Sequence, residues 1–172
     1  MAEGIVNQYQ CSTNEKPHRL CRVQYDGSMS LQARGNQNFS SEDEFKWAIE
    51  AHLNWFNHTP TPFVSTFSNR QQAKNWAHRC SGNGHKVEAI LELNPLRFGP
   101  IFSVLRLVQD RHLGVNTNLS ESTYVNEYLV LDEIPRNSII QHDNNSGDDI
   151  SVSDGSDISD NEHNNADPRA VE

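Results

Sequence analysis

The sequence predicts a β-rich α+β domain that ends in a disordered acidic tail. Several segments alternate apolar and polar residues with the period of two that is typical of strands, and others repeat apolar residues at helical spacing behind a capping residue. The last part of the chain is dominated by Asn, Ser, Asp and Gly. The 172 residues fit one domain of ordinary size: we predict a flexible leader over residues 1–17, the folded domain over 18–141 and the tail over 142–172.

The charge of the chain is concentrated in the tail. The formal net charge is -9; residues 142–172 hold nine acidic residues and one basic residue, whereas residues 1–141 hold 14 acidic and 13 basic ones. The tail has too few apolar side chains to offset the entropy of ordering, which predicts disorder. The nearly neutral domain lacks the clustered cations that bind nucleic acid or an anionic membrane surface, so we expect neither partner.

The sequence indicates a protein of the cytosol or nucleus. No stretch approaches the ~18–20 consecutive apolar residues of a membrane span, and the start of the chain lacks the basic and apolar run of a signal peptide. Cys11, Cys21 and Cys80 form an odd set in such a chain, and we expect reduced thiols rather than a disulfide framework.

The first predicted strand covers residues 19–25, where Cys21, Val23 and Tyr25 share one face. A loop over 29–41 follows, and Ser41 with Glu44 makes a capping box that begins a helix. The apolar face of this helix is predicted to hold Phe45, Ala48, Ile49, Leu53 and Phe56.

A second strand and a second helix are predicted next. The segment HTPTP at 58–62 breaks the first helix, and FVSTF at 63–67 is typical of a short strand. Ser68 with Gln71 repeats the capping-box pattern and predicts another helix. Its buried face is predicted to hold Ala73, Trp76, Ala77 and Cys80.

The remaining segments predict more strands. Residues 86–94 alternate as a half-buried strand does. Over 101–108 the apolar spacing favours a short helix, although IFSVLRLV is also compatible with a strand. Residues 124–135 are apolar on both faces from Tyr128 onward, as in a strand covered on both sides, and 138–141 predicts one more strand.

Common catalytic motifs are absent from the sequence. It contains no GxxxxGK[ST] phosphate loop, no GxGxxG, no HExxH and no GxSxG. His78, Cys80 and His85 form its one close Cys/His cluster, but a tetrahedral zinc site requires four ligands at more regular spacing. We therefore expect no metal.

Three strands each present one polar group where an apolar face is expected. Arg22 interrupts the first strand, Ser65 lies between two phenylalanines of the second, and Glu127 shares a face with Leu129 and Leu131. A carboxylate in a buried strand is costly unless a cation, hydrogen-bond donors or a ligand compensates it. Glu127 therefore lines a cleft, or it pairs with an Arg or lies at the exposed end of its strand.

The order of these segments resembles the mono-ADP-ribosyltransferase fold of the cholera-toxin-like class. That class carries an Arg on its first strand, a Ser-Thr-Ser motif on a second and a Glu on a later one. The matching residues here are Arg22 in LCRVQY, Ser65 and Thr66 in FVSTFS, and Glu127 in NEYLVLDEIP. The resemblance covers residues 19–141 and implies a split β-sheet core with flanking helices. The segments around FVSTFS, NWA and EYLVLDEIP also resemble an uncharacterised domain family common in filamentous fungi.

The resemblance implies NAD as substrate, with Glu127 as the catalytic carboxylate and Arg22, Ser65 and Thr66 as the residues that bind the dinucleotide. Breaking the nicotinamide-ribose bond passes through an oxocarbenium-like state, which an ionised carboxylate stabilises without a metal. Arg supplies a planar, charged fork for ribose or pyrophosphate. Phe67 and Trp76 could pack on nicotinamide, but aromatic side chains at these positions more often belong to a core.

Two positions depart from the class. Arginine-directed members carry a second acid two residues before the catalytic Glu, where this chain has Val125, and the third hydroxyl of Ser-Thr-Ser is replaced by Phe67. The resemblance thus implies an ADP-ribosyltransferase-like protein that transfers ADP-ribose to an unknown protein or small-molecule acceptor, or that hydrolyses NAD. The alternative is a non-catalytic interaction module of the same fold, acting through its surface and its tail.

The tail and the histidines leave further alternatives open. Ser146, Ser151 and Ser159 each precede an acid by three residues, a pattern suited to acid-directed kinases, but such a tail is also typical of a segment that only solubilises. His52 and His112 are assigned no role, because a structural or exposed His is much commoner than a catalytic one.

Overall fold

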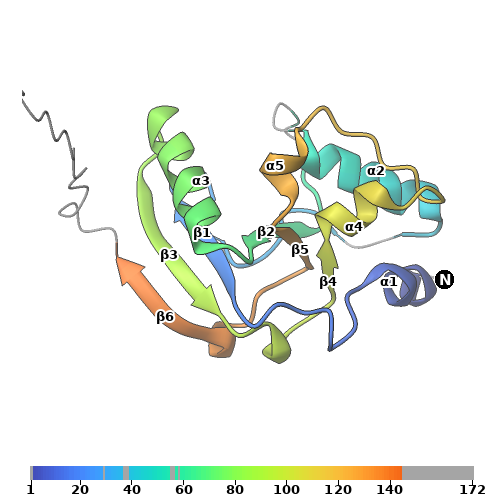
Figure 1. Cartoon of the computed structure of the whole chain (residues 1–172), viewed down its shortest axis with the longest axis horizontal. Helices are drawn as coiled ribbons and strands as arrows, with labels where there is room; N and C mark the ends of the chain where they lie inside the picture. Colours follow the sequence, from blue (N-terminus) through green and yellow to red (C-terminus); the bar gives the residue numbers. More distant parts are fainter. Residues whose placement is uncertain (1, 29, 37–38, 55–56, 58, 145–172) are drawn as a thin grey trace, which may run out of the picture.

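The fold is an antiparallel sheet with helices on it. A computed structural model describes residues 2–28, 30–36, 39–54, 57 and 59–144. Six strands pair in the order β4-β5-β2-β1-β3-β6, all antiparallel (Figure 1). The strands are β1 Leu20–Tyr25, β2 Phe63–Phe67, β3 Val87–Leu93, β4 Ile101–Ser103, β5 Glu127–Leu131 and β6 Ile139–Asn144. The predicted α+β class is confirmed.

In Figure 1 a single helix lies at β1 and β3, and the other helices lie toward β2, β4 and β5. The helices are α1 Ala2–Tyr9, α2 Glu42–Leu53, α3 Arg70–Gly82, α4 Val104–Gln109 and α5 Glu121–Tyr124. Phe67 and Cys21 pack with the buried face of α3, whereas Phe63 and Leu129 pack with α2 and α4. These four strand residues share one face by alternation and register, so both helix groups cover the same face of the sheet.

The sheet divides between β1 and β2. Of these two fully described strands, a single residue pair is in register, Cys21 with Phe67, whereas β2 and β5 pair along their whole length. The sheet therefore consists of two halves, β4-β5-β2 and β1-β3-β6, which meet at one point. The other residues of β1 and β2 are not paired with each other, which leaves a space between the two halves of the sheet.

The helix beginnings were predicted with mixed success. Ser41 caps α2 as predicted, accepting a hydrogen bond from the Glu44 N–H at 3.2 Å. The Ser68 cap is wrong: Asn69 caps α3, and its side chain accepts from both Gln71 and Gln72, which satisfies two free N–H groups at once. Phe56, predicted for the buried face of α2, lies outside the described residues.

The segment 101–109 contains both a strand and a helix, the two structures with which its apolar pattern was compatible. Residues 101–103 form β4 and residues 104–109 form α4. Ser103 separates the two elements, because its side chain accepts a hydrogen bond from the Arg106 N–H and begins the helix. The strand predicted within 124–135 is β5, which begins at Glu127 after the short helix α5.

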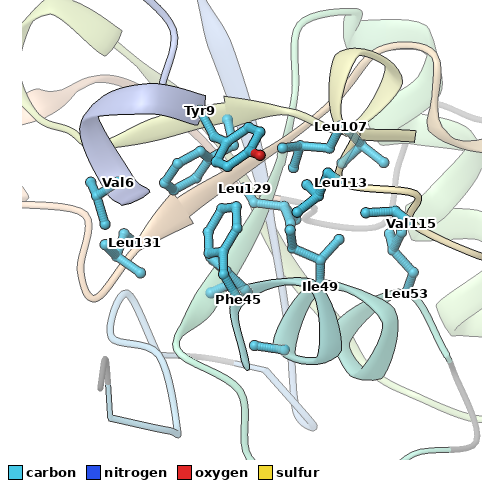
Figure 2. Packing of buried hydrophobic residues seen from close by; sticks show 14 of the residues in the cluster. Val6, Tyr9, Phe45, Ile49, Leu53, Leu107, Leu113, Val115, Leu129 and Leu131 are labelled. Carbon is cyan, nitrogen blue, oxygen red and sulfur yellow. The ribbon is translucent and has the colours of Figure 1, made fainter. Parts of the chain in front are cut away.

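The flexible leader predicted over residues 1–17 is wrong for its first half. Residues 2–9 form α1, whose Val6 and Tyr9 are buried in the same cluster as Phe45 and Leu129 (Figure 2). The Tyr9 ring stacks on Phe45 at 5.4 Å between ring centroids, and its hydroxyl donates to the Glu42 carboxylate at 3.0 Å. These contacts come from α2, so the local sequence could not reveal them.

We expect Tyr9→Phe to lower the free energy of unfolding by roughly 0.5–1.5 kcal/mol, because it removes the hydrogen bond to Glu42 and keeps the stacked ring. Urea unfolding at pH 7 measures the difference. A variant as stable as the parent would show that the contact between α1 and α2 is not formed in solution.

The end of the domain also differs from the prediction. The last strand was predicted at 138–141 and the tail from 142, but β6 runs from Ile139 to Asn144 and pairs with β3. The rest of the predicted tail, with its three candidate phosphorylation sites, lies outside the described residues. Within the described part of the chain, no helix is long and apolar enough to cross a membrane.

Candidate functional site

A pocket of about 510 Å³ lies where the two halves of the sheet separate. Its walls come from the end of α2, the loop after β1, the strands β1, β2 and β5, and one residue of α3. Arg22, Ser65 and Glu127 all line it. The structure thus brings together the three polar residues that the sequence singled out on three adjacent strands.

Ser65 faces the pocket because of its place between two clusters. Phe63, two residues before it, packs with α2, and Phe67, two residues after it, packs with α3. All three side chains lie on the same face of β2 by strand alternation. Ser65 therefore faces the space between the helices, where no apolar residue is needed.

Glu127 is the first residue of β5, opposite Phe67 of β2, and is only 9% exposed. Burial raises the pKa of its carboxyl to about 7, and the neighbouring Ser65 hydroxyl and Arg22 charge oppose that rise. No ion pair joins Arg22 and Glu127 among the described residues. Of the alternatives for this carboxyl, the structure therefore has it lining a cleft.

Arg22 connects the two halves of the sheet. Its Nη1 donates to the Ser65 carbonyl at 3.0 Å, and its Nη2 contacts the Ser28 side chain and the carbonyls of Ser28 and Ser30 in the loop after β1. The residue is 8% exposed, and burial lowers its pKa to about 10, so the guanidinium stays charged at neutral pH. Its Nε is buried without a hydrogen-bond partner among the described residues.

His52 belongs to the site although the sequence analysis gave it no role. Its Nδ1 lies 2.6 Å from the Thr61 hydroxyl and its Nε2 lies 2.8 Å from the Ser65 hydroxyl. Burial, together with the charges of Arg22 and Arg34, lowers the pKa of His52 to about 4, so the ring is neutral at physiological pH.

Because the His52 ring is neutral, one of its nitrogens donates a hydrogen bond and the other accepts one. Because the Ser65 hydroxyl can donate to the Glu127 carboxylate, it accepts from His52 Nε2, and His52 Nδ1 accepts from Thr61. The chain of hydrogen bonds therefore ends on the carboxylate. The sequence feature that could have indicated His52 is its helical spacing from Phe45 and Ala48, which lie on the buried face of α2.

Thr66 does not belong to the pocket, contrary to its predicted role in binding the dinucleotide. It is fully buried, and its hydroxyl donates to the Tyr128 carbonyl of β5 at 3.0 Å. Its side chain faces the side of the sheet opposite Ser65, and it is not among the residues that line the pocket. Its role is structural.

Two aromatic residues form part of the pocket wall. Phe67 and Trp76 both line it, with their ring centroids 6.3 Å apart. Phe67 is buried against α3, as expected for a core residue, whereas Trp76 is half-buried. Where the structure describes side chains, no group of three or more His, Cys, Asp and Glu is arranged to hold a metal ion.

The chain belongs to the family described as Domain of unknown function (DUF7587), whose family model matches residues 8–148. The matched span contains all six strands and every pocket residue discussed above. No curated protein matches the chain.

Proposed function

We propose that this DUF7587 domain binds NAD in the pocket and cleaves its nicotinamide-ribose bond, passing ADP-ribose to an acceptor or to water. The observation that supports it best is the convergence of Arg22, Ser65 and Glu127 on one pocket from three adjacent strands. These are three of the four residues that the resemblance to mono-ADP-ribosyltransferases predicts to act together; the fourth, Thr66, lies outside the pocket. The single register pair between β1 and β2 further supports a split sheet of that kind.

The chemistry assigns a separate task to Glu127. As the bond between ribose C1′ and the nicotinamide nitrogen breaks, its electron pair leaves with nicotinamide, which becomes neutral, and positive charge develops on the ribose. The ionised carboxylate of Glu127, which is 9% exposed, stabilises that charge from a largely buried position. The acceptor, or water, then bonds to C1′ and loses its proton.

The neighbours of Glu127 support this assignment. Ser65 faces the carboxylate, and His52 Nε2 contacts the serine hydroxyl at 2.8 Å. The His52 ring is in turn held by the Thr61 hydroxyl at 2.6 Å. His52 is thus a positioning residue in this proposal, since it acts through Ser65.

The buried Nε of Arg22 supports a ligand with hydrogen-bond acceptors. An unpaired buried donor costs about 1–3 kcal/mol, and a ribose or phosphate oxygen would satisfy it. The pocket volume of about 510 Å³ lies in the range of roughly 300–1,000 Å³ that is usual for small-molecule sites. The absence of an acid at Val125 argues for an acceptor other than arginine.

The proposal is tested by nicotinamide release from NAD by the full chain, with and without a cell lysate as a source of acceptors. We expect release whose rate rises with pH through about 7, because Glu127 acts as the ionised form and its pKa is about 7. A positively charged nicotinamide ring in the site would move this midpoint to lower pH at saturating NAD.

No release at any pH from 5 to 9, from a chain that is folded by circular dichroism, would contradict the enzyme proposal. It would favour the interaction-module alternative instead.

A further inference from the structure

A second arginine, Arg34, lines the same pocket as Arg22. It lies in the loop after β1 and its side chain is exposed. None of the described residues forms an ion pair or a hydrogen bond with it. Its charge is close enough to lower the pKa of both Arg22 and His52. Two like charges that face one pocket repel each other unless an anion lies between them.

Backbone hydrogen bonds on both sides of Arg34 fix the position of its main chain beside the pocket. The Ala33 N–H donates to the Asp132 carbonyl at 2.6 Å, and the Gly35 N–H donates to the Thr61 carbonyl at 2.9 Å. A Cβ on Gly35 would lie 2.7 Å from the carbonyl carbon of Thr61, so only glycine allows this approach. The loop is thus fixed on both sides of Arg34.

Among the described residues, neither acidic residue of the pocket forms an ion pair with Arg22 or Arg34. Asp26 accepts from His85 Nδ1 at 2.9 Å, and Glu127 is accompanied by Ser65. Arg22 still has an unpaired, buried Nε. Among the described residues, the arginine donors of the pocket without a partner are therefore the Nε of Arg22 and the guanidinium of Arg34.

We infer that Arg22 and Arg34 form a two-armed site for the diphosphate group of a nucleotide. Arg34 offers its planar fork to a pair of phosphate oxygens, Arg22 offers the one donor that it does not use within the protein, its Nε, and their two positive charges match the two negative charges of the diphosphate in NAD. This inference deepens the proposed function and rests on it for the identity of the whole ligand, since the diphosphate is the central group of NAD. It adds Arg34 as a binding residue that no strand pattern indicates.

The test is binding of ADP to the full chain by isothermal titration calorimetry, with adenosine as the ligand that lacks phosphates. We expect ADP to bind at least about tenfold more tightly than adenosine, since charge-assisted hydrogen bonds contribute that much. Arg34→Gln should weaken ADP binding by at least about tenfold, and Arg34→Lys should weaken it less. The matched control is Arg111→Gln, which removes one exposed charge outside the pocket and should leave ADP binding unchanged.

Three results would overturn the inference: no binding of ADP, equal binding of ADP and adenosine, or undiminished ADP binding by folded Arg34→Gln. Failure here and failure of the proposed function are distinguishable. Nicotinamide release that Arg34→Gln leaves unchanged would refute the role of Arg34 alone. ADP binding that depends on Arg34, without any cleavage of NAD, would refute the catalytic proposal alone.

Discussion

Glu127→Gln should reduce nicotinamide release by roughly 10²- to 10⁴-fold, the range expected when a catalytic charge or proton-transfer group is lost. The substitution keeps the shape of the side chain and removes only the charge that, in the proposed function, stabilises the developing oxocarbenium ion. NAD binding should change much less, because Arg22 and the pocket walls remain. Rates under saturating NAD separate the two effects.

The same substitution should make the folded protein more stable at alkaline pH. The folded state raises the pKa of Glu127 from 4.5 to about 7, so it binds the proton more tightly than the unfolded chain does. The stability of the parent therefore falls as pH rises from about 4.5 to about 7, and the loss is complete above that range. Over this window the loss amounts to about 3 kcal/mol, and Gln, which does not titrate, escapes it.

Urea unfolding of parent and variant at pH 4.5 and pH 8 measures this effect. We expect the variant to gain about 3 kcal/mol relative to the parent between the two pH values. The contribution of His52, whose lowered pKa weakens the folded state as pH falls from 6.5 to about 4, is common to both proteins and is largely removed by subtraction. Glu133→Gln, at an exposed site, is the matched control and should show no such gain.

A parallel pH dependence of parent and variant would show that Glu127 is not held in a costly environment. Unchanged nicotinamide release would exclude it as the catalytic carboxylate. Loss of activity together with a gain in stability is the combination that a functional, rather than structural, carboxyl should show.

The strands were predictable because the pattern that defines them is local. Alternation in 86–94 follows directly from which face each residue buries, and the structure has a strand over Val87–Leu93. The segment 63–67 was predictable from its β-branched and aromatic residues after a breaker, and the structure has a strand over Phe63–Phe67 that is buried on both faces. Alternation also places Thr66 on the face opposite Ser65, but it does not decide the site by itself, because Arg22 and Val64 lie on that opposite face and still line the pocket. The helix α1 was not predictable in this way, because its buried face depends on Phe45 and Glu42 in a different segment.

The site was only partly predictable for a similar reason. Glu127 stands out in the sequence because a carboxyl among Leu129 and Leu131 needs a partner. His52 does not stand out, since its spacing on α2 fits equally a core histidine, and its contact with Ser65 arises only when α2 packs on β2. Arg34 has no pattern at all: its place at the pocket depends on the Gly35 and Ala33 backbone contacts with distant segments.

Arg22 joins the two halves of the sheet and, in the proposed function, also binds NAD. Arg22→Met should lower the affinity for NAD by roughly 30-fold or more, the range for truncating one member of a buried charged contact. Methionine has a similar length but cannot donate to the Ser65 carbonyl or to the loop at Ser28 and Ser30. Arg22→Lys should not restore the affinity, because one ammonium cannot serve the strand, the loop and the ligand at once.

The two variants should differ in a property that a merely structural role would not change. Arg22 lowers the pKa of Glu127, so Met should move the pH dependence of unfolding that is due to Glu127 to higher pH, whereas Lys, which keeps a charge, should move it less. Circular dichroism establishes that both variants fold. Wild-type affinity for NAD in Arg22→Lys would show that only a positive charge is needed at this point, and that the fork of the arginine, joining the two halves of the sheet beyond their one register pair, has no part in binding.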